Sequence, residues 1–189
     1  IGNNLFAATQ GSTGVYRSTN NGASWTQVNS GLTDMQVLRL AVKGNDLYAG
    51  TYDNGIFRTT NYGVNWINCL NTSRVYSLDV IGNDIFAGTH YTGTFRSTNN
   101  GLNWVGINNG ISFPVFGGFT SFGNNLFAGT RDAGGVFLST NNGDNWNSVN
   151  NGLIYNDVIH IVSKDSTLYA MSTGSGGMFI STNKGGNWA

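Results

Sequence analysis

Charge, cysteine and proline are all scarce in this sequence of 189 residues, and each shortage excludes something. Nine basic and nine acidic residues give a net charge of zero, and there is no glutamate. Because positive charge is not in excess, we expect no binding to nucleic acid and no general attraction to anionic membrane surfaces. A single proline beside 28 glycines is typical of short strands joined by tight turns, which predicts an all-β protein.

Long apolar runs are also missing. No segment is long enough to span a bilayer, so we expect no membrane insertion. No basic segment followed by an apolar one opens the chain, but Ile1 stands in mid-repeat, so this says nothing of cellular location. The single cysteine, Cys69, occupies a repeat position held elsewhere by Val28, Ile107 and Val149. We interpret it as a small buried side chain and not as a reactive thiol.

Motifs that hold metals or cofactors do not occur in the sequence. His90 and His160 are its two histidines, and neither has a second ligand at a recognisable spacing. Glycine-rich segments such as 117–118 and 174–177 do not open a helix, which argues against a phosphate cradle. The sequence therefore predicts no cofactor and no metal site.

What the sequence contains instead is a repeat. An eight-residue segment close to Ser-Thr-Asn-Asn-Gly-x-Asn-Trp occurs five times and accounts for all five tryptophans. We call these segments the box turns; their defining residues are Asn20, Gly22, Trp25, Asn61, Gly63, Trp66, Asn99, Gly101, Trp104, Asn141, Gly143, Trp146, Asn183, Gly185 and Trp188. The tryptophans recur after 41, 38, 42 and 42 residues, a period typical of one four-stranded propeller blade.

Each complete repeat contains three β-rich runs, the last of which leads into the box turn. A short strand follows the tryptophan. In the second copy these runs are residues 37–42, 46–51 and 55–60, and the other copies repeat the last two in the same order. Their first-run counterparts are 75–80, 116–122 and 158–163. The runs are apolar on both faces, which suits a sheet packed between two others. The small pair Ala49 and Gly50 allows close backbone approach near the centre of the ring.

These patterns predict one β-propeller of five four-stranded blades, at about 1–31, 32–70, 71–110, 111–152 and 153–189. The first blade lacks its innermost strand, and the last stops one residue after Trp188. We therefore expect either a window of a longer array or a five-blade ring with incomplete closure. In the second case the incomplete blades offer surfaces for self-association.

The box turn has a structural interpretation. Asn side chains hydrogen-bond backbone amides nearby and tolerate left-handed φ, and Gly takes positive φ without steric cost. The tryptophan then supplies an apolar body between blades and an indole N–H that needs an acceptor. We therefore predict that the box turns have a structural role and not a catalytic one.

The turns resemble the Asp-box, or BNR, repeat, whose pattern is Ser-x-Asp-x-Gly-x-Thr-Trp. Ser18, Asn20, Gly22, Ser24 and Trp25 take the five defined positions in the first copy, and every copy has Asn in place of Asp. The family includes sialidases, xyloglucan-cleaving hydrolases, sortilin-like receptors, photosystem assembly factors and Asn- and Gly-rich secreted bacterial proteins. The resemblance implies a propeller whose binding face lies opposite the boxes, and a location outside the cell or on its surface.

A sialidase would need three arginines around a carboxylate, an aspartic acid and a Tyr–Glu pair, and this chain has no Glu. Arg17, Arg58 and Arg96 share one repeat position, which indicates stems packed between blades and not an arginine triad. Glycoside hydrolysis in general needs two carboxylates about 5–10 Å apart. The aspartates in loops on the face opposite the boxes could supply them: Asp34, Asp53, Asp132 and Asp157.

Binding residues are expected where the copies differ. The loops between the second and third runs and the connections between blades differ in every copy, and both emerge opposite the box turns. The predicted ligand-binding residues there are Tyr52, Asp53, His90, Tyr91, Arg131 and Asp132. Aromatic rings beside planar polar groups suit neutral sugars. The sequence thus favours a non-enzymatic module that binds a glycan or an extracellular protein, with a hydrolase fragment and an assembly scaffold as the alternatives.

Overall fold

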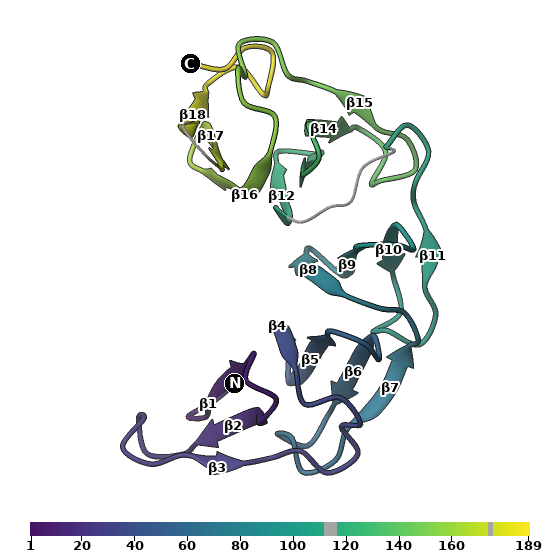
Figure 1. Ribbon diagram of the computed structural model, residues 1–189, viewed down its shortest axis with the longest axis vertical. Coiled ribbons are helices and arrows are strands. Elements are labelled where there is room, and N and C mark those ends of the chain that lie inside the picture. Colours follow the sequence, from purple (N-terminus) through teal and green to yellow (C-terminus); the bar gives the residue numbers. More distant parts are fainter. Residues whose placement is uncertain (112–116, 174–175) are drawn as a thin grey trace.

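The computed structural model describes residues 1–111, 117–173 and 176–189. Within them the chain forms five antiparallel sheets and no helix, and hence no helix that could cross a membrane. The sheets follow one another along an arc (Figure 1), and the first and last have three strands where the middle three have four. The predicted all-β propeller architecture is confirmed, including its two incomplete sheets.

Each sheet consists of strands that are consecutive in the sequence. The first contains β1 (Leu5–Thr9), β2 (Gly14–Ser18) and β3 (Thr26–Gln27). The second contains β4 (Val37–Lys43), β5 (Asp46–Thr51), β6 (Ile56–Thr59) and β7 (Ile67–Leu70). The third contains β8 (Val75–Ile81), β9 (Asp84–Thr89), β10 (Thr94–Ser97) and β11 (Val105–Gly106). The fourth contains β12 (Phe119–Phe122), β13 (Asn125–Thr130), β14 (Gly135–Ser139) and β15 (Asn147–Ser148), and the fifth β16 (Val158–Lys164), β17 (Thr167–Ser172) and β18 (Gly177–Ser181).

The strands run from the inside of the arc to its outside in chain order. β4, β8, β12 and β16 lie along the concave side, and β3, β7, β11 and β15 lie along the convex side (Figure 1). Small residues allow the inner strands to approach, as predicted: a Cβ on Gly50 would lie 2.6 Å from a Val75 methyl carbon, and one on Gly129 would lie 2.8 Å from a Val158 methyl carbon. The start of the predicted run 116–122 falls outside the described residues.

The hydrophobic core is divided into four clusters, one between each pair of neighbouring sheets. The cluster between the first two sheets contains Val15, Leu32, Val37, Leu47, Ala49, Phe57 and Trp66, all buried. That between the last two contains Phe127, Val136, Leu153, Val158, Ile161, Leu168, Ala170, Phe179 and Trp188. Each sheet therefore buries its faces against its neighbours in the sequence, as expected for blades.

The box turns share one hydrogen-bond pattern in all five copies. The hydroxyl of the first residue accepts the backbone N–H of the box glycine at 2.8–3.1 Å. The box asparagine accepts the backbone N–H four residues further on at 2.8–3.0 Å. The residue before the glycine has a positive φ in every copy, from 57° to 59°. The bonds stay within each turn, which fits the structural interpretation.

The box tryptophans join each blade to the one before it. Trp66, Trp146 and Trp188 donate their indole N–H to the backbone oxygens of Val28, Ile107 and Val149 at 2.7–2.9 Å, and their own backbone N–H groups bond the connection between blades. Glycines in that connection make this contact possible: a Cβ on Gly31, Gly110 or Gly152 would lie 2.1–2.3 Å from the tryptophan carbonyl oxygen. The second joint, at Trp104, is different.

Candidate functional site

The blade end opposite the box turns carries the loops in which binding residues were predicted. Because the strands are antiparallel, the loop that precedes β6, β10 or β14 lies at one end of the strand and the box turn at the other. Of the six predicted residues, Tyr52 and Asp53 follow β5, His90 and Tyr91 follow β9, and Arg131 and Asp132 follow β13. Their loops thus lie at the same end of three consecutive blades.

Three of the six, Tyr52, His90 and Tyr91, gather around a residue that was not predicted, Arg74. The guanidinium carbon of Arg74 lies 4.7 Å from the ring centroid of Tyr52 and 5.0 Å from that of Tyr91. Its Nη1 donates to the Tyr91 hydroxyl at 2.7 Å and lies 3.3 Å from Nδ1 of His90. We call Tyr52, Arg74, His90 and Tyr91 the aromatic–arginine cluster.

The rings of the cluster also pack on one another. His90 stacks on Tyr91 with centroids 4.2 Å apart, and its edge meets Tyr76 of β8 at 5.8 Å. Tyr91 nevertheless keeps 65% of its surface exposed. The cluster therefore offers an accessible ring beside a cation, an arrangement that can stack on an apolar face and bond an oxygen at its rim.

Asp53 lies next to Tyr52, but its backbone is bonded to another residue, Asp34. Its backbone N–H, like that of Asn54, is bonded to the carboxylate of Asp34, at 2.6 and 3.3 Å, while its own side chain is exposed. Asp34 also accepts the N–H of Gln36 at 2.9 Å. Asp34 thus fixes the loop by capping three amides, and its role there is structural.

Arg131 and Asp132 belong to a separate part of the same face. Asp132, whose φ is +56°, lines a hollow of about 470 Å³ together with Tyr155 and Asp157. Asp157 accepts hydrogen bonds from the N–H of Ala133 and the hydroxyl of Thr173, both at 3.3 Å. Asp132 and Asp157 thus line the same hollow, whereas the aromatic–arginine cluster belongs to the preceding blades. Arg131 is half-buried in the β13–β14 loop. The connection at 112–114, also counted among the variable loops, lies outside the described residues.

Two charged residues of this region, Arg74 and Asp79, were not predicted as functional residues from the sequence. Arg74 ends the connection that leads to β8, at the place of Gln36 and Asp157 in other blades. Asp79 lies inside β8. The residues at the same position of the other inner strands, β4, β12 and β16, are Ala41, Thr120 and Val162. Burial raises the pKa of Asp79, while the N–H of Phe119, bonded to it at 3.0 Å, and the charges of Arg39 and His160 oppose that shift. For Asp79 the available signal was a charge at a position that is uncharged in the other copies, and for Arg74 it was a cation where other copies have Gln36 or Asp157.

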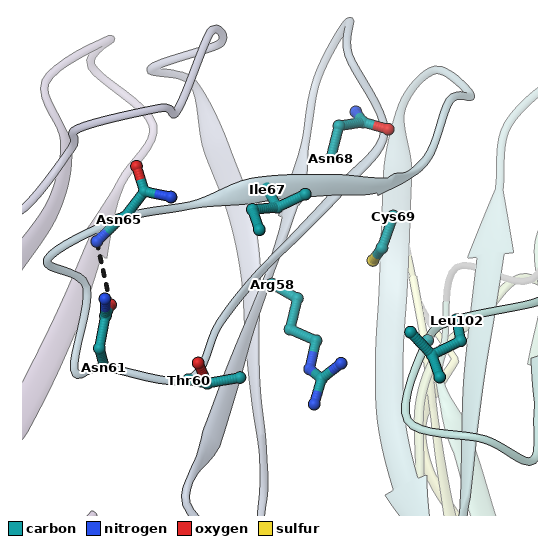
Figure 2. A pocket seen from close by; sticks show the side chains of 9 residues that line it. Arg58, Thr60, Asn61, Asn65, Ile67, Asn68, Cys69 and Leu102 are labelled. Carbon is teal, nitrogen blue, oxygen red and sulfur yellow. Dashed lines mark hydrogen bonds between the residues drawn. The ribbon is translucent and has the colours of Figure 1, made fainter.

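A further hollow of about 360 Å³ lies on the box side, between β7 and the third box turn. Figure 2 shows it lined by Arg58, Ile67, Cys69 and Leu102 among others. Arg58 does not reach across it, because its guanidinium bonds Asp46 of its own blade at 2.6 Å, whereas Arg96 reaches Asp144 of the next box turn at 3.2 Å. Cys69 is half-buried at the wall of this hollow, not fully buried as the sequence suggested. Burial raises the pKa of its thiol to about 11, so the group is protonated at neutral pH.

The hollow has a cause in the chain itself. The connection after β7 is short and has Thr72 where other blades have Gly31, Gly110 and Gly152. The backbone bond that Trp66, Trp146 and Trp188 make to the preceding connection has no counterpart at Trp104 among the described residues. The buried Trp104 indole N–H lies near Cys69, and it has no hydrogen-bond acceptor in the part of the chain that the structure describes. This joint is therefore more open than the others. The short connection after β7 accounts for the hollow, and no ligand is needed to explain it.

Comparison with known proteins gives the fold. No protein-family model and no curated protein matches the chain. Among solved structures, an ancestral GH74 enzyme matches 99% of the chain with a TM-score of 0.78 and 22% identity over 29% of its own length. The GH74 xyloglucanase from Xanthomonas campestris matches 99% with a TM-score of 0.75 and 18% identity over 35% of its length.

A third solved structure, YCF48 bound to D1 peptide, matches 97% of the chain with a TM-score of 0.65 and 13% identity over 62% of its length. The chain thus spans about a third of the GH74 enzymes and under two thirds of YCF48. At these identities the likeness establishes the class of protein, a β-propeller, and extends no further.

Proposed function

We propose that this propeller is a binding module that recognises carbohydrate through the face opposite its box turns. The observation that carries the proposal is the aromatic–arginine cluster, in which loops of two blades and the connection between them place a 65% exposed tyrosine ring beside a guanidinium group. Sugars present apolar faces that stack on such rings and hydroxyls that bond planar polar groups. The likeness to xyloglucanase propellers is consistent with a glycan ligand.

The test is a glycan array followed by titrations with soluble cell-wall polysaccharides. Replacement Tyr91→Ala should weaken binding about fivefold, since a stacked aromatic contributes on the order of 1 kcal/mol. Leu102→Ala is the matched control, because Leu102 is 71% exposed but lies in the third box turn. A flat response to every glycan would refute the proposal, and equal losses for both variants would place the binding elsewhere.

A second candidate function is glycoside hydrolysis. Its support is that Asp132 and Asp157 line one hollow, and that the chain resembles hydrolase propellers. Release of reducing sugar that is abolished by Asp132→Asn, and unchanged by Asp144→Asn in a box turn, would favour this function. Absence of release would leave binding alone.

A further inference from the structure

Arg74 is a cation without a carboxylate partner. Arg58 pairs with Asp46 and Arg96 with Asp144, whereas Arg74 makes no ion pair within the described residues. The contacts of its guanidinium are the two tyrosine rings, the Tyr91 hydroxyl and Nδ1 of His90. None of these contacts is to a carboxylate. Arg74 therefore has no carboxylate of the described residues within ion-pair distance, although Asp34 and Asp53 lie in neighbouring loops of the same face.

The donors that Arg74 still has available lie in one plane. Its Nη1 is engaged by Tyr91 and His90, while no acceptor of the described residues bonds Nε or Nη2. The rings of Tyr52 and Tyr91 restrict the orientation of the guanidinium. A planar fork with free donors at its edge matches the two oxygens of a carboxylate and is preorganised for them.

The backbone at Arg74 is held in a conformation that its side chain does not favour. Its φ is +49°, in the left-handed region, and its N–H bonds the carbonyl oxygen of Tyr52 at 2.5 Å. The corresponding position in other blades is Gln36 or Asp157, so the fold itself does not require a cation there. A bulky residue kept in a strained conformation, at a position where the fold is indifferent, is typical of a functional site.

We propose that the aromatic–arginine cluster binds the carboxylate of an acidic sugar, a uronate, with the carboxylate in the plane of the Arg74 guanidinium and the sugar ring against Tyr91. This inference rests on the proposed glycan-binding function and specifies its ligand. A sugar is favoured over an acidic peptide because the ring beside the cation is exposed and can stack on a pyranose face. Since the net charge of the chain is zero, recognition depends on this local cation and not on a general field.

The test compares each acid with its own ester. Trimers of galacturonate, glucuronate and mannuronate, and the methyl ester of each, are titrated calorimetrically at low salt into the unmodified chain. At least one acid should bind about tenfold or more tightly than its ester, because the ester loses the charge-assisted bonds to Arg74. Added salt should weaken binding of the acid more than that of the ester.

Variants then assign the effect to Arg74. Arg74→Gln should abolish the preference for acid over ester, and Arg74→Lys should retain only part of it, because an ammonium cannot form the planar fork. Both keep a long side chain at the strained position, and circular dichroism checks their fold. Arg96→Gln is the control, since Arg96 lies at the box end of its blade and pairs with Asp144.

The outcomes separate the two proposals. Equal binding of acids and esters would overturn the carboxylate site but leave a glycan-binding module. Binding of aspartate-rich peptides with no binding of any uronate would overturn it in favour of a protein ligand. Failure of all uronates together with a flat glycan array would remove both proposals.

Discussion

At the scale of single residues, Asp79 shows how a charge is accommodated between blades. Its carboxylate accepts the N–H of Phe119, the first residue of the next inner strand, at 3.0 Å. Thr120, in the corresponding position of β12, similarly accepts the N–H of Ser163 at 3.1 Å. The side chain thus performs a joining role for which a neutral oxygen suffices, and burial makes its charge unfavourable.

Asp79→Asn should therefore stabilise the protein at neutral pH, because an amide oxygen can still accept from Phe119 without a buried charge. A raised pKa means that the native state binds the proton more tightly than the unfolded one. The wild type consequently loses stability as pH rises from about 4, the unfolded value, through the folded pKa. The midpoint of thermal unfolding should be higher for Asp79→Asn than for the wild type at pH 7, and the two midpoints should converge toward pH 4.

Asp165→Asn serves as the control, since Asp165 is an exposed turn residue and its replacement should change neither midpoint. A lower midpoint for Asp79→Asn at pH 7 would mean that Arg39 and His160 stabilise the charge more than burial opposes it.

Residue-level prediction from the sequence rested on comparison of the copies. Tyr52, His90 and Tyr91 were proposed because they interrupt a repeated pattern at a turn; the structure places them together, and their binding of a ligand stays a prediction. Their assembly around Arg74 could not be inferred, since it depends on how neighbouring blades rotate and on the positive φ of Arg74. Asp132 and Asp157 line one hollow for the same kind of reason, although they belong to two blades and are 25 positions apart in the chain.

At the scale of elements, the joints between blades are unequal. Trp146 and Trp188 are almost fully buried and bond a carbonyl oxygen of the preceding outer strand, whereas Trp104 has no oxygen acceptor. The difference follows from the connection after β7, where Thr72 replaces a glycine that would allow the chain to pass over the tryptophan carbonyl. One joint of the four is thus closed mainly by apolar contact.

Tryptophan-to-phenylalanine replacements should measure this inequality. Trp146→Phe leaves the buried carbonyl of Ile107 without its donor, while Trp104→Phe removes no bond to oxygen. We expect Trp146→Phe to lower the free energy of unfolding by about 1 kcal/mol more than Trp104→Phe does. Urea denaturation followed by circular dichroism gives both values. Trp188→Phe should resemble Trp146→Phe, and equal losses at 104 and 146 would contradict the account.

The elements themselves were readable from the sequence because local chemistry repeats five times. Asn and Gly impose the turn, the tryptophan begins the outer strand, and the runs between them are short and apolar. The unusual length of β7, four residues where β3, β11 and β15 have two, was not foreseen. The greater length of β7 arises from the same divergent connection. That connection changes the path open to the backbone, which the strand propensity of the residues does not reveal.

At the scale of the whole molecule, stability is distributed over nearest-neighbour interfaces. The four core clusters lie between successive sheets, and each buried side chain contacts its own blade and an adjacent one. A chain built in this way behaves as a linear series of coupled units, in which a local loss spreads only to neighbours.

Hydrogen exchange should reveal this in two matched variants. Ile161→Val in the last cluster and Ile56→Val in the second remove one buried methylene group each, at about 1 kcal/mol. Exchange followed by mass spectrometry should accelerate several-fold in β13–β18 for the first variant and in β5–β9 for the second. Uniform acceleration over all five sheets would show a single cooperative unit instead.

The direction of the joints has a consequence for synthesis. The first, third and fourth blades are each sealed by the tryptophan of the blade that follows, so Val28, Ile107 and Val149 receive their indole partners from residues 38 or 39 positions later. At about 5–20 residues per second a ribosome needs a few seconds for that distance. Throughout those seconds the newest blade presents an open apolar face, which a chaperone or a second nascent chain can reach before its own successor arrives.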